Sequence, residues 1–287
     1  KKEVNFILNK EKEPLKTIIK ESKESNKLVE EFMLLANKKV AEVFSNQKKK
    51  DNIYRVHDLP KTEKIIALER VIKNLGYNNR LDNQKDIHQN INNLLNKVDN
   101  TPEKNLIDTL VIRSMSKAKY STKNIGHFGL SFEKYTHFTS PIRRYPDVIV
   151  HRYLQNILNK NQKTNEKLED NCLYLSSREE LATKAERSSI KFMQVKYMAS
   201  KINKKYMGVI SGIMERGVFI ELKENKCEGF VRAKDIPGDY FVFNEKSFLM
   251  HGRNTKEEYR LGDEVMVQVK GVNEYKKQID FLLLEKL

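Results

Sequence analysis

Two adjacent arginines, Arg143 and Arg144, lie in the stretch with the most chemically active side chains, residues 135–147. Pro141 and Pro146 flank the pair, and because proline fixes φ and biases the preceding residue toward extended backbone, we expect a rigid loop. A guanidinium held in such a loop suits bidentate capture of a phosphate, but it equally suits bridging to carboxylates of the protein itself. Both interpretations stay open at the level of residue types. The same stretch supplies three further polar or aromatic candidates, Tyr135, His137 and Ser140.

A helix is expected to position this loop. Proline suits the first turn of a helix, and a carboxylate there is favoured by the helix dipole, so Pro146 and Asp147 predict a helix start. The histidines nearby, His127 and His137, could carry protons or bind a metal, although a hydrogen-bonded structural role is the more common one. Apolar residues that recur at helical spacing predict the buried face of this helix: Val150, Tyr153, Leu154, Ile157 and Leu158.

The charge of the chain points to a polyanionic partner. The 287 residues include 54 basic and 39 acidic ones, for a net charge of +15. The stretch from 204 to the end holds 15 basic and 14 acidic residues, so nearly all of the excess lies before it. A basic surface of this size favours RNA or DNA, whereas a lysine-rich solvated surface is the alternative.

Other classes of protein are disfavoured. The sequence has no apolar run near 18 residues and no signal-peptide pattern, so we expect a cytoplasmic protein with no membrane partner. Its two cysteines, Cys172 and Cys227, are far apart and predict reduced thiols, with neither a disulfide framework nor a zinc site. The chain begins with Lys1 and not with Met, so we expect its natural start to lie elsewhere.

The first 203 residues predict a helix-rich region with few strands. Extended segments are expected around a turn at 9–14, with a further extended piece at 53–60. Helices are expected from about 25, over 61–75 and 87–98, after 102, and from about 176 to 201. The helix that begins near 25 should bury an apolar stripe: Leu28, Phe32, Leu35, Ala36, Val40 and Val43.

The pattern changes to strands after residue 204. Five short strands are expected over 206–213, 217–222, 227–232, 263–270 and 278–284, with a long insertion from about 238 to 260. Such a pattern fits a small Greek-key barrel of the OB type, which binds single strands through a basic groove and aromatic platforms. The fold class is therefore α+β, a helix-rich part followed by a five-stranded barrel.

Several motifs together resemble the RNase II/RNase R family of 3′-to-5′ exoribonucleases. The residues 126–130 (GHFGL) and 135–147 (YTHFTSPIRRYPD) are similar to the family's most recognisable run, and 28–37 and 54–58 match earlier landmarks. The resemblance implies that residues 1–203 form the C-terminal portion of an RNB catalytic domain. It implies an S1-type RNA-binding domain over 204–287.

The resemblance also implies a reaction and a cofactor. Members of the family processively hydrolyse RNA from single-stranded 3′ ends to nucleoside monophosphates, with Mg²⁺ held by closely spaced aspartates. No DxD motif occurs in this sequence. We therefore expect the metal ligands on a missing N-terminal half, a candidate partner, and we expect the chain alone to be inactive. The alternative is a truncated RNA-binding module that holds RNA without cutting it.

Individual residues acquire roles through the resemblance. Arg143 matches the arginine that contacts phosphate near the scissile bond, whereas Arg144 could be structural. Tyr135, His137 and Ser140 are expected to shape the channel floor. Glu186, beside Arg187, matches a carboxylate near the RNA end. The family's aromatic base clamp has no assigned position in this chain.

The barrel departs from the family at one point. S1-type domains often carry an aromatic residue before the first-strand glycine, where this chain has Arg216. One stacking platform is therefore expected to be lost. Phe219, Phe230 and Arg232 remain candidate RNA contacts, and a place in the barrel core is the alternative for Phe230.

Overall fold

The computed structural model describes residues 3–47, 52–81, 86–101, 103–160, 167–245 and 247–287. The chain separates into two compact units, which we call the barrel unit (1–21, 61–114 and 186–287) and the loop unit (22–60 and 115–185). Each unit is described by itself. The expected domain boundary after residue 203 stays a prediction: the first barrel strand begins at Lys205, and the compact units are built from discontinuous stretches of chain.

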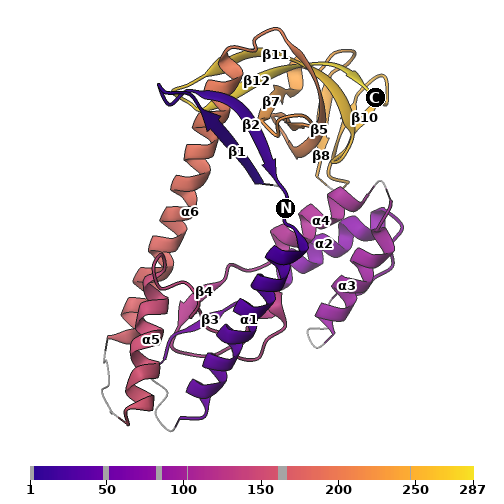
Figure 1. The fold of residues 1–287 in the computed structure, drawn as a ribbon. Helices are drawn as coiled ribbons and strands as arrows, with labels where there is room; N and C mark the ends of the chain where they lie inside the picture. Colours follow the sequence, from indigo (N-terminus) through magenta and orange to yellow (C-terminus); the bar gives the residue numbers. More distant parts are fainter. Residues whose placement is uncertain (1–2, 48–51, 82–85, 102, 161–166, 246) are drawn as a thin grey trace. The chain divides into compact units, whose positions relative to one another are not determined.

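A closed barrel forms the largest part of the barrel unit (Figure 1). Its strand order is β11-β12-β7-β6-β5, and all five strands predicted from alternation are confirmed. The alternating residues explain this result, because inward positions such as Val218, Ile220 and Leu222 are fully buried in one apolar core. The strands are β5 (Lys205–Met214), β6 (Gly217–Leu222), β7 (Glu228–Arg232), β11 (Glu264–Asn273) and β12 (Gln278–Lys286).

The long insertion of the barrel has regular structure of its own. It follows a 3₁₀ turn, η2 (Ala233–Asp235), and contains a three-stranded sheet of β8 (Phe241–Asn244), β9 (Leu249–Gly252) and β10 (Glu258–Tyr259). Phe241, Met250 and Tyr259 from these strands join the core of the barrel. The insertion is therefore packed onto the barrel and forms part of the same folded body.

Three helices and a hairpin complete the barrel unit. The helices are α2 (Thr62–Asn74), α3 (Ile87–Val98) and α4 (Lys104–Ser114), close to their predicted bounds, and Figure 1 shows them grouped together. Leu106 of α4 belongs to the barrel core, so α4 packs onto the barrel, and α2 and α3 both contact α4. The hairpin is β1 (Glu3–Leu8) and β2 (Pro14–Lys20), which confirms the predicted extended segments around a turn.

The loop unit surrounds a two-stranded sheet with helices. The sheet pairs β3 (Tyr54–Val56) with β4 (Lys119–Ser121), and a 3₁₀ turn, η1 (Phe128–Leu130), follows. The helices are α1 (Glu24–Ser45), α5 (Tyr145–Leu158) and the first part of α6 (Leu168–Ala199). One apolar cluster joins the three helices to β4, with Phe44 from α1, Tyr120 from β4, Val150 from α5 and Cys172 from α6.

The buried stripe predicted for α1 is largely wrong. Its buried residues are Asn37, Val40, Ala41 and Phe44, and of these only Val40 was expected. Leu28, Phe32 and Leu35 are 60%, 63% and 50% exposed. The helical period of the sequence is right, but the periodicity cannot say whether anything packs on the apolar face.

The fold bears on the expectations for the two cysteines and for membrane-spanning helices. Cys172 and Cys227 are free thiols and both are buried, as expected for structural cysteines. Among the helices described, none combines the length and the hydropathy that crossing a bilayer requires.

Candidate functional site

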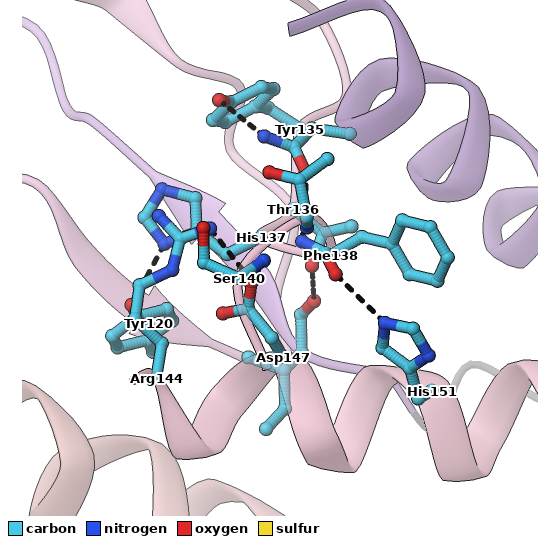
Figure 2. A network of polar contacts seen from close by, with 12 residues as sticks. Tyr120, Tyr135, Thr136, His137, Phe138, Ser140, Arg144, Asp147 and His151 are labelled. Carbon is cyan, nitrogen blue, oxygen red and sulfur yellow. Dashed lines mark hydrogen bonds and ion pairs between the residues drawn. The ribbon is translucent and has the colours of Figure 1, made fainter. Parts of the chain in front are cut away.

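A single carboxylate holds in place the loop that carries Arg143 and Arg144, residues 140–145, which we call the arginine loop. Asp147 is fully buried in the first turn of α5, and its Oδ1 accepts hydrogen bonds from the Ser140 amide at 2.8 Å and from the Arg144 guanidinium at 2.7 Å (Figure 2). The Arg144 amide also donates to the carbonyl of Ser140 at 3.0 Å. These contacts fix both ends of the loop, as the two prolines predicted. Arg144 therefore has the internal, structural contact that was one of its two expected roles.

Arg143 has the opposite environment. Its side chain is exposed, and its neighbour Ile142 at the tip of the loop is fully exposed. Within the part of the chain that the structure describes, its guanidinium has no ion pair or hydrogen bond. The loop thus separates the pair, with one arginine held by Asp147 and the other free to bind an anion such as phosphate.

Asn37 connects this loop to α1. Its side-chain oxygen accepts hydrogen bonds from the amides of Phe138 at 2.8 Å and Thr139 at 3.2 Å, and its side-chain nitrogen donates to the Tyr135 hydroxyl at 3.0 Å. Asn37 is 3% exposed and Tyr135 is 4% exposed. Tyr135 therefore supports the loop from inside.

His137 is held neutral beneath the loop. Its Nδ1 lies 2.9 Å from the Tyr120 hydroxyl, and Figure 2 shows the two side chains facing one another. Burial, reinforced by the charges of Arg144 and Arg55, lowers the pKa of His137 to about 2. Burial also raises the pKa of Tyr120 well above its ordinary value. Both groups are uncharged at neutral pH, which is consistent with a structural histidine.

A second arginine site lies against Tyr120. The Arg55 guanidinium lies over the Tyr120 ring at 4.7 Å from its centroid and forms an ion pair with Glu179 of α6. The Arg55 side chain is only 13% exposed. Sequence reasoning had not assigned Arg55 a role, because the two partners of this ion pair are more than a hundred residues apart. The one feature of the sequence that could have indicated a role for Arg55 was its position in residues 54–58, which match the family.

His57 has hydrogen-bond partners on both ring nitrogens, whereas the neighbouring His127 ring, 5.1 Å away between centroids, has a buried Nδ1 without one among the described residues. His57 Nδ1 accepts a hydrogen bond from the Gly129 amide at 2.8 Å, and its Nε2 lies 2.6 Å from the carbonyl of Ser116. A Cβ on Gly129 would lie 2.7 Å from His57 Nδ1, so only glycine permits this approach. Burial and the neighbouring His57 lower the pKa of His127 to about 4. His127 is therefore neutral at pH 7.

The described residues do not fit the Mg²⁺ that the resemblance implies. A hard divalent cation of this kind is bound through carboxylate oxygens in octahedral geometry. Within the described ranges, no group of three or more Asp, Glu, His or Cys residues is arranged to hold a metal. Asp147, the acidic residue closest to the arginine loop in sequence, is already engaged by Arg144 and Ser140.

The barrel presents a separate aromatic surface. Phe219 of β6 and Phe230 of β7 are directly opposite in register, and their ring centroids are 4.9 Å apart. Both side chains are partly exposed, and in β7 the buried positions are Gly229 and Val231. The barrel-core alternative for Phe230 is therefore wrong. Arg232 is exposed on the same strand.

Glu186 and Arg187 lie on the part of α6 that belongs to the barrel unit. Both side chains are exposed. Their predicted proximity to an RNA end stays a prediction, as do the channel-floor roles of Tyr135, His137 and Ser140.

The comparisons with known proteins agree on both parts of the chain. The model of the RNB domain matches residues 1–160, and the model of the S1 RNA binding domain matches residues 200–283. The ribonuclease R of Aquifex aeolicus is 36% identical over 99% of this chain, and that of Escherichia coli is 32% identical over 98%. These matches cover 41% and 36% of the two relatives, so the chain spans about two fifths of their length.

Solved structures show the same fold. Mycoplasma genitalium RNase R in complex with ribose methylated single-stranded RNA has a TM-score of 0.88 and 28% identity, covering 99% of this chain and 45% of that one. Yeast Ssd1, described as a pseudonuclease, has a TM-score of 0.61 at 22% identity, covering 78% of this chain and 29% of that one, which shows the fold alone. The helix-rich part with its arginine loop, the barrel and these matches show that the chain belongs to the RNB family of RNase II and RNase R.

Proposed function

We propose that this chain is part of an RNase R-like 3′-to-5′ exoribonuclease and supplies the surface that holds the 3′ end of single-stranded RNA. The complete enzyme would hydrolyse RNA processively to nucleoside monophosphates in the cytoplasm. Support comes from family membership, from the net charge of +15 and from the ribonuclease R relatives.

The observation that carries the proposal is the geometry of the arginine loop. Asp147 neutralises Arg144 and fixes the loop, while Arg143 is exposed and, among the described residues, has no carboxylate partner. An unpaired guanidinium on a fixed backbone is suited to bidentate contact with a phosphodiester. Arg143 would hold a phosphate close to the 3′ end, with Arg144 in a supporting role.

The barrel would bind RNA through Phe219 and Phe230. Aromatic rings on such barrels stack with bases of any sequence, and arginine adds contact with the backbone. Arg232 is exposed beside these rings, although its guanidinium lies 4.0 Å from Asp280. This exposed pair is screened by solvent and would not prevent contact with RNA.

The metal chemistry would come from outside these 287 residues. Mg²⁺ would be held by carboxylates elsewhere in the enzyme, because the residues that the structure describes contain no suitable cluster. The same observation favours a second candidate function, a non-catalytic RNA-binding module. The two candidates make the same prediction for this chain alone, and they differ once an aspartate-bearing RNB polypeptide is supplied.

The test uses a single-stranded RNA with a free 3′ end and a matched RNA whose 3′ end is buried in a hairpin. We expect the chain to bind the first RNA more tightly, and to release no nucleoside monophosphate from either when Mg²⁺ is added. Equal affinity for the two RNAs would contradict a 3′-end site. Release of monophosphates by the purified chain would contradict the assignment of the metal ligands to other residues.

A further inference from the structure

Helices α2 and α4 and the insertion of the barrel line a pocket of about 810 Å³. All of its lining residues belong to the barrel unit, and Figure 1 shows α2 and α4 side by side. Positions 64, 67, 68 and 71 have the spacing of one helix face, so α2 turns a single face to the pocket. The volume lies in the range of about 300–1,000 Å³ that is typical of small-molecule sites.

The floor of the pocket is apolar and continues into the barrel core. Leu68 and Val71 of α2 are 3% and 7% exposed, and Leu110 of α4 packs against the core cluster of the barrel. Phe248, just before β9, packs against the same cluster and is half-buried. Its ring meets the Phe243 ring edge-on, with 5.5 Å between the centroids. The wall of the pocket therefore holds one aromatic ring in a fixed place, a suitable contact for a planar ligand.

Basic side chains surround this apolar floor. Lys64, Arg70 and Lys73 come from α2 and Arg113 comes from α4, whereas Glu245 is the one acid among the described residues that line the pocket. All four basic residues are exposed. Within the part of the chain that the structure describes, none of them forms an ion pair. The pocket therefore carries an excess of positive charge that its own carboxylates leave uncompensated.

One of these cations lies beside the aromatic wall. The Arg113 guanidinium lies over the Phe248 ring, 5.9 Å from its centroid. Lys64 Nζ donates a hydrogen bond to the carbonyl of Arg113 at 3.0 Å, which ties the end of α4 to α2. A guanidinium and an aromatic ring thus lie next to one another over an apolar floor. These are the groups that an aromatic ligand with an attached phosphate requires.

We propose that this pocket, the α2–α4 pocket, binds a free nucleoside monophosphate, with its base against Phe248 and its phosphate at Arg113 and the basic residues of α2. A terminal phosphate carries about 1.5–2 negative charges at pH 7, whereas a phosphodiester of RNA carries one. Four basic residues against one acid favour the terminal phosphate. This inference does not rest on the proposed function, because neither Arg143 nor RNA hydrolysis enters into it.

The test titrates the chain with adenosine 5′-monophosphate (AMP) and with three analogues that each lack one feature of it. We expect AMP to bind at one site. Adenosine lacks the phosphate and inorganic phosphate lacks the base, so each should bind about tenfold more weakly or worse. The methyl ester of AMP has a single negative charge, like a unit of an RNA strand, and should also bind more weakly than AMP.

Variants of the pocket assign the two halves of the ligand. Phe248→Leu keeps an apolar side chain against the barrel core but removes the ring, and it should weaken AMP binding about tenfold. Arg113→Gln should have an effect of similar size without disturbing the apolar floor, since one charge-assisted contact is lost. Arg216→Gln is the matched control, because Arg216 is an exposed arginine of the barrel unit outside the pocket. It should leave AMP affinity unchanged, as should Arg143→Ala.

Several outcomes would overturn the α2–α4 pocket as a nucleotide site. Absence of saturable AMP binding is one, and equal affinity for AMP and inorganic phosphate is another, because charge alone would then explain the site. Equal affinity for AMP and its methyl ester would indicate a contact for an RNA strand instead. Equal losses in the Arg113 and Arg216 variants would also contradict it. A loss of AMP affinity in Arg143→Ala but not in Arg113→Gln would place the ligand at the arginine loop.

Discussion

Arg144 and Asp147 form a buried ion pair that is three residues apart in sequence, with 2.7 Å between Nη2 and Oδ1. Asp147 is fully buried and the Arg144 side chain is 19% exposed. Removal of one member of such a pair leaves an uncompensated charge in the interior. The pair therefore controls the stability of the loop unit as well as the shape of the arginine loop.

Asp147→Ala should destabilise the loop unit by about 3–5 kcal/mol, because it leaves the Arg144 guanidinium and the Ser140 amide unpaired. Urea unfolding followed by hydrogen exchange at the Ser140 amide measures the effect. The double variant Arg144→Ala with Asp147→Ala should cost clearly less than the sum of the two single variants. Additive costs would show that the pair is not coupled.

Arg143→Ala should weaken binding of a single-stranded RNA 3′ end by about 1.5–3 kcal/mol, the value of a charge-assisted hydrogen bond. The salt dependence of binding should also fall by about one unit of slope, since one phosphate contact is lost. Arg178→Ala is the matched control, because Arg178 is an exposed arginine of the same unit that stacks on Tyr174. Equal losses in the two variants would argue against a specific role for Arg143.

Phe219→Ala and Phe230→Ala should each weaken binding of single-stranded RNA by about 1–3 kcal/mol, the value of stacking one base on an aromatic ring. Both rings are partly exposed, so the barrel should remain folded in circular dichroism. Tyr240→Ala is the control, since Tyr240 is a 61% exposed aromatic residue of the same unit that stacks with Arg253. An RNA affinity that changes only in the Tyr240 variant would place the stacking surface elsewhere.

The loop unit should lose stability as the pH falls below about 6.5. Burial lowers the pKa of His137 to about 2 and that of His127 to about 4, from an ordinary value of 6.5. The unfolded chain therefore takes up protons below pH 6.5 that the folded chain does not, so the stabilisation is complete above that pH and declines below it.

Melting temperatures measured from pH 7.5 to 4.5 test this dependence. His137→Gln should reduce the slope, because it removes the histidine whose pKa is lowered the most of the two. A wild-type melting temperature that is constant over this range would contradict the buried, neutral state of the two histidines.

Local patterns in the sequence were sufficient for part of this structure. The alternation in Val218, Ile220 and Leu222 predicted a strand with one buried face, because the period of two follows directly from the backbone. The position of Pro146 predicted the start of α5, since proline is tolerated in the first turn of a helix. The Arg144–Asp147 pair also lies within one turn of chain, although its spacing was not used to predict it.

The sequence alone did not predict contacts between distant parts of the chain. Arg55 meets Glu179 only because β3 and α6 pack together in the loop unit. Asn37 was noted beside an apolar stripe, yet its three hydrogen bonds depend on residues 135–139 being brought to α1. The exposure of Phe32 depends on which residues surround α1, and the periodicity of the α1 sequence carries no information about them.

The contacts of Asp147 have a consequence for the kinetics of binding. Ser140, Arg144 and Asp147 order the loop during folding, so little conformational entropy is left to be lost when a ligand arrives. A preorganised contact of this kind adds to the lifetime of a complex more than to its rate of formation. Loss of Arg143 should therefore appear chiefly as faster dissociation of RNA, whereas loosening the loop through Asp147 should also slow productive association.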